Sequence, residues 1–104
     1  MIARTWNGVV LREKADAYAH YLNQTGVADC HRTPGNQGVH VLRRDEGDRS
    51  YFLFISFWES EAVIRAFAGD DIERARYYPE DTEFLLELEP TVTHYQVVSP
   101  TDHD

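Results

Sequence analysis

The stretch SYFLFISFWESEAVIRAF, residues 50–67, decides how the rest of the chain is arranged. Its first half is an almost unbroken run of β-forming residues, whose side chains alternate between the two faces of a strand. One face carries Phe52, Phe54 and Trp58. The other face carries Tyr51, Leu53, Ile55 and Phe57. Because a strand that is apolar on both faces needs cover on both, we place it in the middle of a sheet.

A helix is predicted directly after this strand. Ser60 is a good N-cap, and Glu61 places a negative charge in the first turn. Apolar residues then follow at helical spacing, namely Val63, Ile64, Ala66, Phe67 and Ala68. Gly69 is expected to end the helix. A central strand that leads straight into an amphipathic helix indicates an α+β sandwich.

The residues before this stretch predict two more strands and another helix. Residues 2–11 alternate loosely and are rich in β-formers, and a helical period then runs up to Gly26, its expected end. Residues 27–38 contain a proline and two glycines and predict a loop. Residues 39–44 predict the second strand, which a hairpin turn over residues 45–49 joins to the central strand.

The residues after the second helix predict shorter elements. Asp70 and Glu73 are spaced as a capping box for a short helix over residues 72–77. A further helical turn is expected after Pro79. Residues 91–98 alternate again and predict the last strand.

The main elements follow the order βαββαβ, which predicts an α+β, ferredoxin-like fold with an antiparallel four-stranded sheet. One domain covers residues 1–98, and residues 99–104 form a polar C-terminal tail. Both helices must pack on the same face of the sheet. The opposite face keeps large apolar side chains that one chain cannot cover, so we expect a homodimer in which two sheets pack face to face.

Composition narrows the class of partner and the compartment. The net charge of −8 provides no basic face for nucleic acid or for an anionic membrane. The single cysteine, Cys30, excludes an intrachain disulfide and fits a reducing compartment. The N-terminal residues carry no charged-then-apolar signal, and no apolar run is long enough to span a membrane. We therefore expect a cytoplasmic protein.

Asn7 is the first candidate for a functional side chain. It lies in the middle of a central strand, on a face that is otherwise made of Ala3, Thr5, Val9 and Leu11. One interpretation is that its side chain bonds a neighbouring backbone at a bulge beside Gly8. The other is that it is a fixed amide donor aimed into a cavity between the sheet and the helices. The sequence leaves both open.

Four other residues are candidates for the same cavity or for the core. Trp58 is interpreted as a core or interface residue. Tyr77 and Tyr78 form either a half-buried aromatic lid or a hydroxyl that orients a phenolic substrate. His94 is either a structural histidine or, by its alternation in the last strand, one that faces a cavity.

No metal site is predicted, because no two of the five histidines lie at ligand spacing with a carboxylate beside them. The sequence also contains no glycine-rich phosphate loop and no nucleophile elbow. An acidic group is interpreted as a solvated helix start and consists of Glu80, Asp81 and Glu83.

The succession of motifs resembles the antibiotic biosynthesis monooxygenase domain family. Besides the βαββαβ order, the motifs are TPGNQG at residues 33–38, FWESEAVIRAFAG at residues 57–69 and VTHYQVV at residues 92–98. The resemblance covers roughly residues 2–98. It implies a dimeric α/β barrel with one pocket per subunit between helices and sheet. Members include oxygenases that convert phenols or quinols to quinones without metal or flavin, and another branch binds and degrades haem.

The resemblance also implies roles for particular residues. The haem-degrading branch has an Asn on the first strand, where Asn7 matches, a Trp where this chain has Phe67, and an axial His where it has Tyr77. Without that histidine we expect weak haem binding or none, although tyrosine can ligate ferric haem. In the cofactor-free branch, Asn7 would donate to a substrate or peroxy oxygen and Tyr77 would orient the substrate. The implied pocket residues are Trp58, Phe67, Tyr78 and His94.

The expected function is therefore a cofactor-independent monooxygenase that uses O2 on a small electron-rich aromatic of the phenol, quinol or anthrone type. No cofactor or metal is expected. One alternative is a dimeric protein that binds a small ligand without turning it over. The other alternative is a relative that binds or degrades haem.

Overall fold

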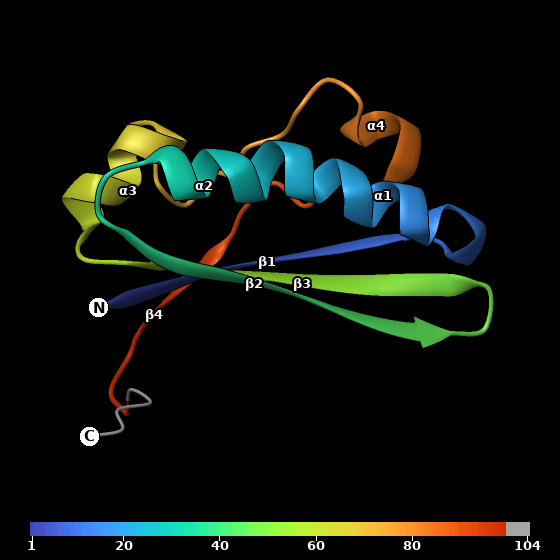
Figure 1. The fold of residues 1–104 in the computed structure, drawn as a ribbon, viewed down its shortest axis with the longest axis horizontal. Helices are drawn as coiled ribbons and strands as arrows, with labels where there is room; N and C mark the ends of the chain where they lie inside the picture. The colour runs from blue at the N-terminus through green and yellow to red at the C-terminus, as the bar shows by residue number, and fades with distance from the viewer. Residues whose placement is uncertain (100–104) are drawn as a thin grey trace.

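The computed structural model describes residues 1–99, which form a four-stranded antiparallel sheet with helices on one face (Figure 1). The strands are β1 (Ile2–Leu11), β2 (Asn36–Glu46), β3 (Arg49–Trp58) and β4 (Thr93–Gln96). Their order in the sheet is β2-β3-β1-β4, so the first and third strands are central. This order confirms the predicted α+β, ferredoxin-like fold. Apart from residue 99, the predicted polar tail lies outside the described residues.

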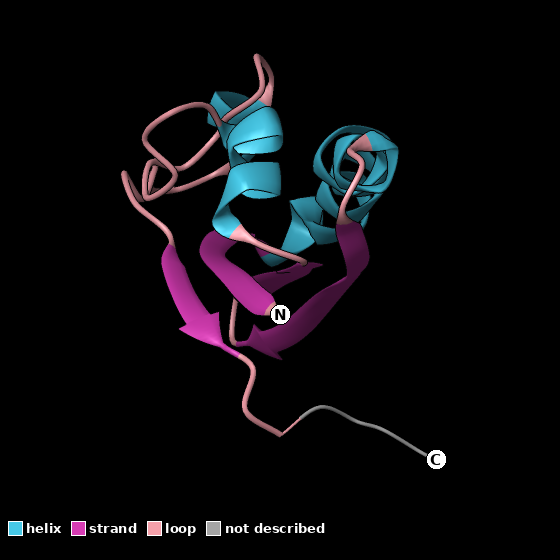
Figure 2. Cartoon of the chain, turned by 90° about the vertical axis from the view of Figure 1, so that its left-hand side faces the viewer, coloured by secondary structure: helices cyan, strands magenta, loops and turns pink. Residues whose placement is uncertain are grey.

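The helices form one long rod and two short pieces. The rod comprises η1 (Arg12–Lys14), α1 (Ala15–Leu22), the π-helical segment η2 (Asn23–Val27) and α2 (Ala28–Arg32). The short pieces are α3 (Glu61–Ala68) and α4 (Asp81–Phe84). Figure 2 shows all of them on the same side of the sheet. None of the helices in the described part of the chain is long and apolar enough to cross a membrane.

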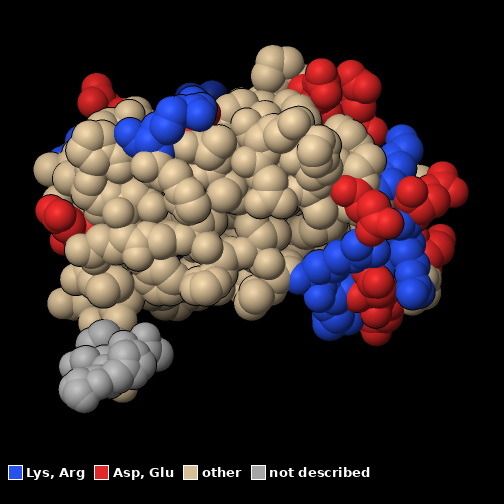
Figure 3. Space-filling view, in the orientation of Figure 1, with Lys and Arg blue, Asp and Glu red and all other residues tan. Residues whose placement is uncertain are grey.

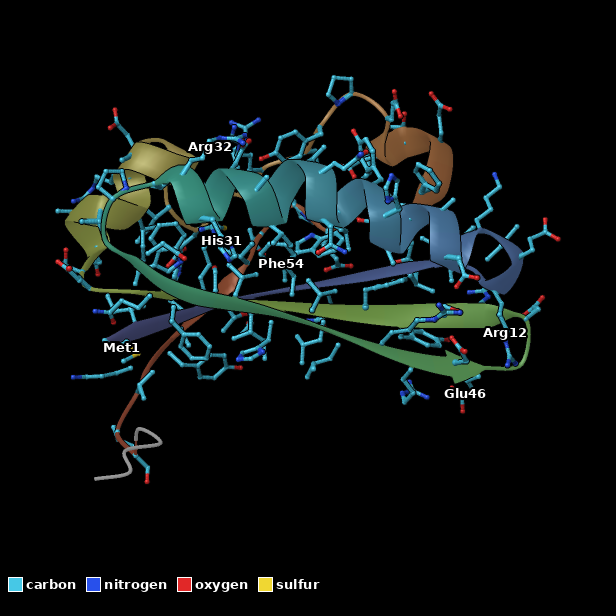
Figure 4. All side chains as sticks on the ribbon, viewed as in Figure 1. Met1, Arg12, His31, Arg32, Glu46 and Phe54 are labelled. Atoms are coloured by element: carbon cyan, nitrogen blue, oxygen red, sulfur yellow. The ribbon has the colours of Figure 1, made fainter. Side chains whose placement is uncertain are left out.

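The expectation that Gly26 ends the first helix is wrong. The chain stays helical to Arg32, and Gly26 is buried inside the rod. A Cβ on Gly26 would lie 3.2 Å from Cε2 of Phe54, which lies between the sheet and the rod (Figure 4). This glycine therefore permits a close approach of helix to sheet instead of a helix end. The loop predicted for residues 27–38 is correspondingly short, and β2 begins at Asn36.

The prediction for α3 and the segment after it is confirmed at the helix ends and wrong for residues 72–77. α3 follows Ser60 and ends at Gly69, whose φ of +92° suits glycine. The helix predicted for residues 72–77 is absent, and this segment pairs with residues 90–92 instead. Arg74 forms an isolated bridge with Thr91, which satisfies backbone groups that a helix would otherwise pair internally.

The two faces of β3 differ sharply in cover. On the helix side, Phe52, Phe54 and Trp58 are buried, with Trp58 fully enclosed. No helix of the described chain covers the other side, which we call the open face (Figures 1 and 2). By strand register the open face comprises Thr5, Asn7, Val9, His40, Leu42, Tyr51, Leu53, Ile55 and Phe57.

Charged side chains of both signs gather at the end of the sheet where the β2–β3 hairpin turns (Figure 3). Asp45 forms ion pairs with Arg43 at 2.9 Å and with Arg12 at 3.7 Å. The hydroxyl of Ser50 also donates to Asp45 at 2.6 Å. These pairs are solvent-exposed and contribute little to stability individually.

Candidate functional site

A pocket lies between the sheet, the helix rod and the segment that follows α3. We call it the helix-side pocket; it is lined by Arg4, Trp6, Tyr18, Leu22, Gly26, Phe54, Phe67, Arg76, Tyr77, Tyr78, Asp81 and Val92. The centre of a water-sized sphere can occupy about 50 Å³ of it. One water needs roughly 10–15 Å³ by this measure, so the pocket has room for a few waters or one small ring.

A hydrogen-bonded pair of aromatic residues forms one wall. Trp6 faces the helices because it lies opposite Phe54 in the β1–β3 register. Its Nε1–H donates to the hydroxyl oxygen of Tyr77 at 3.0 Å, and that hydroxyl donates to the carbonyl of Glu89 at 2.5 Å. The two rings meet edge to face at 6.1 Å. Burial raises the pKa of Tyr77, so its hydroxyl is a fixed, neutral group at neutral pH.

Arg4 is a buried cation on the same strand. It is 5% exposed and donates from Nη1 to the carbonyl of Ile72 and from Nη2 to that of Arg74 at 3.2 Å. Its Nη1 also lies 3.3 Å from Nε2 of His94. Burial lowers the pKa of Arg4, and nearby Arg76 lowers it further. These contacts tie the segment after α3 to the sheet.

Asp29 on α2 holds two pocket residues in place. The hydroxyl of Tyr78 donates to its carboxylate at 2.6 Å, and Nη2 of Arg76 donates at 3.1 Å. The hydrogen bond from Tyr78 is the main cause that lowers the pKa of Asp29. The Arg76 guanidinium lies over the rings of Phe67 at 4.8 Å and of Tyr78 at 5.1 Å. Residues 76–78 are thereby fastened over the pocket.

A carboxyl group occupies the α4 side of the pocket. Asp81, the first residue of α4, is 4% exposed and accepts the backbone N–H of Tyr78 at 2.6 Å. Burial raises its pKa. The interpretation of this acidic group as a solvated helix start is therefore wrong for Asp81, while Glu80 and Glu83 are exposed as expected. Burial also raises the pKa of Tyr18 strongly, with Asp81 adding to the effect.

The structure brings three of the sequence candidates together, namely Phe67, Tyr77 and Tyr78. Asn7 is not among them. It lies opposite Leu53 on the open face and is exposed, so the expected placement in a cavity between sheet and helices is wrong. The bulge interpretation is wrong as well, because the β1–β3 register runs unbroken past Gly8. The cause is the two-residue period of the strand, which turns Trp6 toward the helices and Asn7 away.

Trp58 and His94 lie near the pocket but do not line it. Trp58 belongs to the core, as first interpreted; its Nε1–H donates to the Ser56 hydroxyl at 2.9 Å, and its ring supports Phe67 from behind at 5.4 Å. His94 contacts Arg4 but opens into a separate surface hollow beside Tyr95. Burial is the main cause that lowers the pKa of His94. The expected direct pocket role of both residues is therefore wrong.

The sequence reasoning missed several lining residues, of which Arg4, Trp6, Arg76 and Asp81 carry polar groups. Arg4 had a detectable signal, because it shares a strand face with Ile2, Trp6 and Val10. A charge on the apolar face of a central strand needs a specific partner. Within residues 1–99, no three His, Cys, Asp or Glu side chains lie close enough together to hold a metal ion.

Comparison with known proteins identifies relatives of this fold. The model of the family described as antibiotic biosynthesis monooxygenase matches residues 9–75. A putative antibiotic biosynthesis monooxygenase from Bacillus cereus is 13% identical, with a TM-score of 0.68, over 98% of this chain and 97% of that one. A putative member from Nitrosomonas europaea is 15% identical, with a TM-score of 0.66, over 95% and 100%.

The haem degrader MhuD from Mycobacterium tuberculosis, solved with two haems in its active site, is also similar. It is 18% identical, with a TM-score of 0.60, over 98% of this chain and 100% of that one. At these identities the solved structures show a shared fold. A search of curated proteins found no match.

Proposed function

The chain belongs to the antibiotic biosynthesis monooxygenase family, and on that premise we propose that it is a cofactor-independent monooxygenase acting on a small electron-rich aromatic. The observation that carries the proposal is the helix-side pocket, in which apolar rings surround the fixed Trp6–Tyr77 pair. Such a pocket removes water from an aromatic substrate and presents oriented polar groups to it.

The proposed reaction converts a phenol to a quinone and balances without a cofactor. A ring C–H bond and the O–H bond of the substrate break, and one atom of O2 forms a new C=O bond. The O–O bond breaks, and the second oxygen leaves as water with the two hydrogens. All four electrons taken up by O2 come from the substrate, so no external reductant is needed. The protein has to exclude water, orient the ring and stabilise the developing negative charge.

Each wall of the pocket has a proposed role. The rings of Phe54 and Phe67 form apolar surfaces against which the substrate lies. The Tyr77 oxygen is held by Trp6 and the Glu89 carbonyl. It orients a substrate that carries a second hydroxyl, as a quinol does, by accepting a hydrogen bond from that hydroxyl. Tyr78, fastened to Asp29, closes the outer side. Asn7 has no role in this scheme, because it lies on the other face of the sheet.

The size of the pocket favours a substrate with one ring. Space for a few waters matches a phenol or quinol more closely than a three-ring anthrone. Haem does not fit the residues present, because it is far larger than this space and the Tyr77 hydroxyl already makes two hydrogen bonds. No histidine within residues 1–99 lines the pocket either.

We also propose that the protein is a homodimer through its open face. Leu42 on this face is 51% exposed, and β3 adds Leu53, Ile55 and Phe57, which are partly buried. No helix of the described chain covers this side. An apolar sheet face of this kind is stabilised when a second copy packs on it, at about 25 cal/mol per Å² buried. The dimer leaves the helix-side pocket of each subunit on the outer side of its own sheet.

Oxygen uptake tests the proposed activity. The purified protein is given a panel of one-ring quinols and phenols, with anthrones for comparison and no cofactor, and O2 consumption is recorded with an electrode. We expect uptake with one-ring substrates, a fall in kcat of about tenfold to a hundredfold in Tyr77→Phe, and no change in the matched control Asn7→Ala. No uptake across the panel would favour a binding protein without turnover, and equal losses in both variants would remove Tyr77 from its role.

A further inference from the structure

Arg4 is buried without a carboxylate partner. Its side chain lines the helix-side pocket and is 5% exposed, yet none of the ion pairs within residues 1–99 includes it. Its hydrogen-bond partners are neutral: the carbonyls of Ile72 and Arg74 and the imidazole of His94. A guanidinium taken out of water is costly unless an opposite charge accompanies it. The pocket therefore contains a positive charge that the described chain does not neutralise.

The other charges around the pocket do not remove this excess. Arg76 is a second cation in the lining, and its own partner is Asp29. The carboxyl group in the lining, Asp81, lies on α4 and accepts the amide of Tyr78 without an ion pair to Arg4. Buried carboxyls favour their neutral form, which further limits any compensation from Asp81. The Arg4 side of the pocket is thus electrostatically suited to an anion.

The geometry of Arg4 is already fixed for such a contact. Both Nη atoms are held by backbone carbonyls, while Nε–H donates to no atom of residues 1–99. The Phe67 ring lies 5.8 Å from Cζ of Arg4, and Trp6 follows two residues later on the same strand face. Arg4, Trp6 and Phe67 line the same pocket, so a ring bound in it lies beside this guanidinium.

We propose that the pocket binds its substrate as a phenolate, with the anionic oxygen held by Arg4. This inference rests on the proposed function and names the substrate class for it. A charge-assisted hydrogen bond in a dry site is stronger than a neutral one and favours the ionised phenol over the neutral phenol. The phenolate is also the form that gives electrons to O2 most readily. Arg4 is therefore the residue that selects an ionisable phenol over a neutral aromatic of the same shape.

The probe is 4-nitrophenol, whose anion is yellow and whose neutral form is nearly colourless. It is too electron-poor to be a good substrate, so binding is measured apart from turnover. At a pH slightly below its own pKa, we expect binding to the wild-type protein to increase the yellow fraction. We also expect the anion to bind about tenfold more tightly than 4-nitroanisole, its neutral methyl ether.

Three variants assign the effect. Arg4→Gln should lose the colour change and the preference for the anion, while it still binds 4-nitroanisole, which shows that its pocket is intact. Arg4→Lys should keep part of the preference. Arg65→Gln, a matched control on α3 whose ion pair with Glu61 is exposed, should behave like the wild type. If Arg4→Gln does not fold, the wild-type preference and the partial effect in Arg4→Lys decide the matter.

Equal binding of anion and ether by the wild type, no binding of either, or an unchanged colour shift in Arg4→Gln would overturn the proposal. The outcome is separable from that of the oxygen-uptake assay. A strong preference for the anion without O2 uptake on any substrate would leave the anion site standing and reject the monooxygenase. O2 uptake without a preference for the anion would support the monooxygenase and reject the anion site.

Discussion

The two faces of β3 carry similar side chains but lie in different environments. Its even-numbered aromatic residues lie under the helices and help to form a pocket, whereas Tyr51, Leu53, Ile55 and Phe57 lie on the open face. Both sets are large and apolar, so composition alone does not distinguish them. The difference is set by helices that lie both before and after β3 in the chain, because every helix of the described residues packs on the same side of the sheet. One face is covered within the subunit, and the other is the face on which we propose that a second copy packs.

The most severe way to break this comparison is to place a charge on the helix side. Phe54 is 9% exposed and contacts the position of Gly26 in the rod. Phe54→Asp removes a buried ring, which alone costs about 3–5 kcal/mol, and leaves an unpaired carboxylate in the core. Because domains of this size are stable by only about 5–15 kcal/mol, we expect an unfolded or aggregated chain. Circular dichroism at room temperature measures the loss of structure.

The matched change one residue later has a different expected result. Ile55→Asp places its charge on the open face, where water remains accessible in a single subunit. We expect a folded chain whose sedimentation coefficient falls from that of a dimer to that of a monomer, because a carboxylate of each subunit would be buried between the sheets without a partner. An unfolded Ile55→Asp chain beside a folded Phe54→Asp chain would reverse the assignment of the faces. A wild-type monomer at micromolar concentration would reject the dimer.

The strand and helix order could be predicted because it depends on local patterns. The run of residues 50–67 fixes a central strand, a sharp junction at Ser60 and a stop at Gly69, and each of these is confirmed. The predictions that failed concern positions whose structure depends on tertiary contacts. Gly26 is a residue type typical of helix ends, but here it allows the helix to pack closely against Phe54.

The site was predictable only in part, for a related reason. Tyr77 and Asn7 were both identified from the sequence and given roles by the resemblance, but Tyr77 lines the pocket and Asn7 lies on the other face. A shift of one residue along a strand moves a side chain to the opposite side of the sheet. Asp81 could not be identified from the sequence, because its burial depends on how α4 packs against the rest of the fold.

A smaller effect is expected on the pH dependence of stability, which should differ between a carboxyl in the pocket and one at the hairpin end. Burial raises the pKa of Asp81 in the folded protein, so its contribution to stability is present at acid pH and is lost as the pH rises through that value. Asp81→Asn keeps an oxygen for the Tyr78 amide and removes this loss. Relative to the wild type, the variant should therefore gain stability as the pH rises above the usual range of a carboxyl pKa.

The opposite trend of stability with pH is expected for Asp45, which serves as the matched control. The Ser50 hydroxyl and then Arg43 lower the pKa of Asp45, so its contribution is present at neutral pH and is lost as the pH falls through the lowered value. Asp45→Asn should therefore reduce stability near neutral pH and converge with the wild type in acid. Urea unfolding of the three proteins across this pH range measures both trends. Parallel curves for the two variants would contradict the difference in environment between the sites.

The central claim is that the helix side of the sheet, and not the open face, binds the aromatic substrate. The direct measurement is a 1H–15N NMR titration of the labelled protein with hydroquinone under nitrogen, so that no turnover occurs. Trp6 and Asn7 are neighbours in sequence and point to opposite faces, and each has a side-chain N–H signal of its own. We predict that the Trp6 indole signal, hydrogen-bonded to Tyr77, shifts with increasing ligand while the Asn7 amide signals stay in place. A shift of the Asn7 amide with an unmoved Trp6 indole would contradict the account.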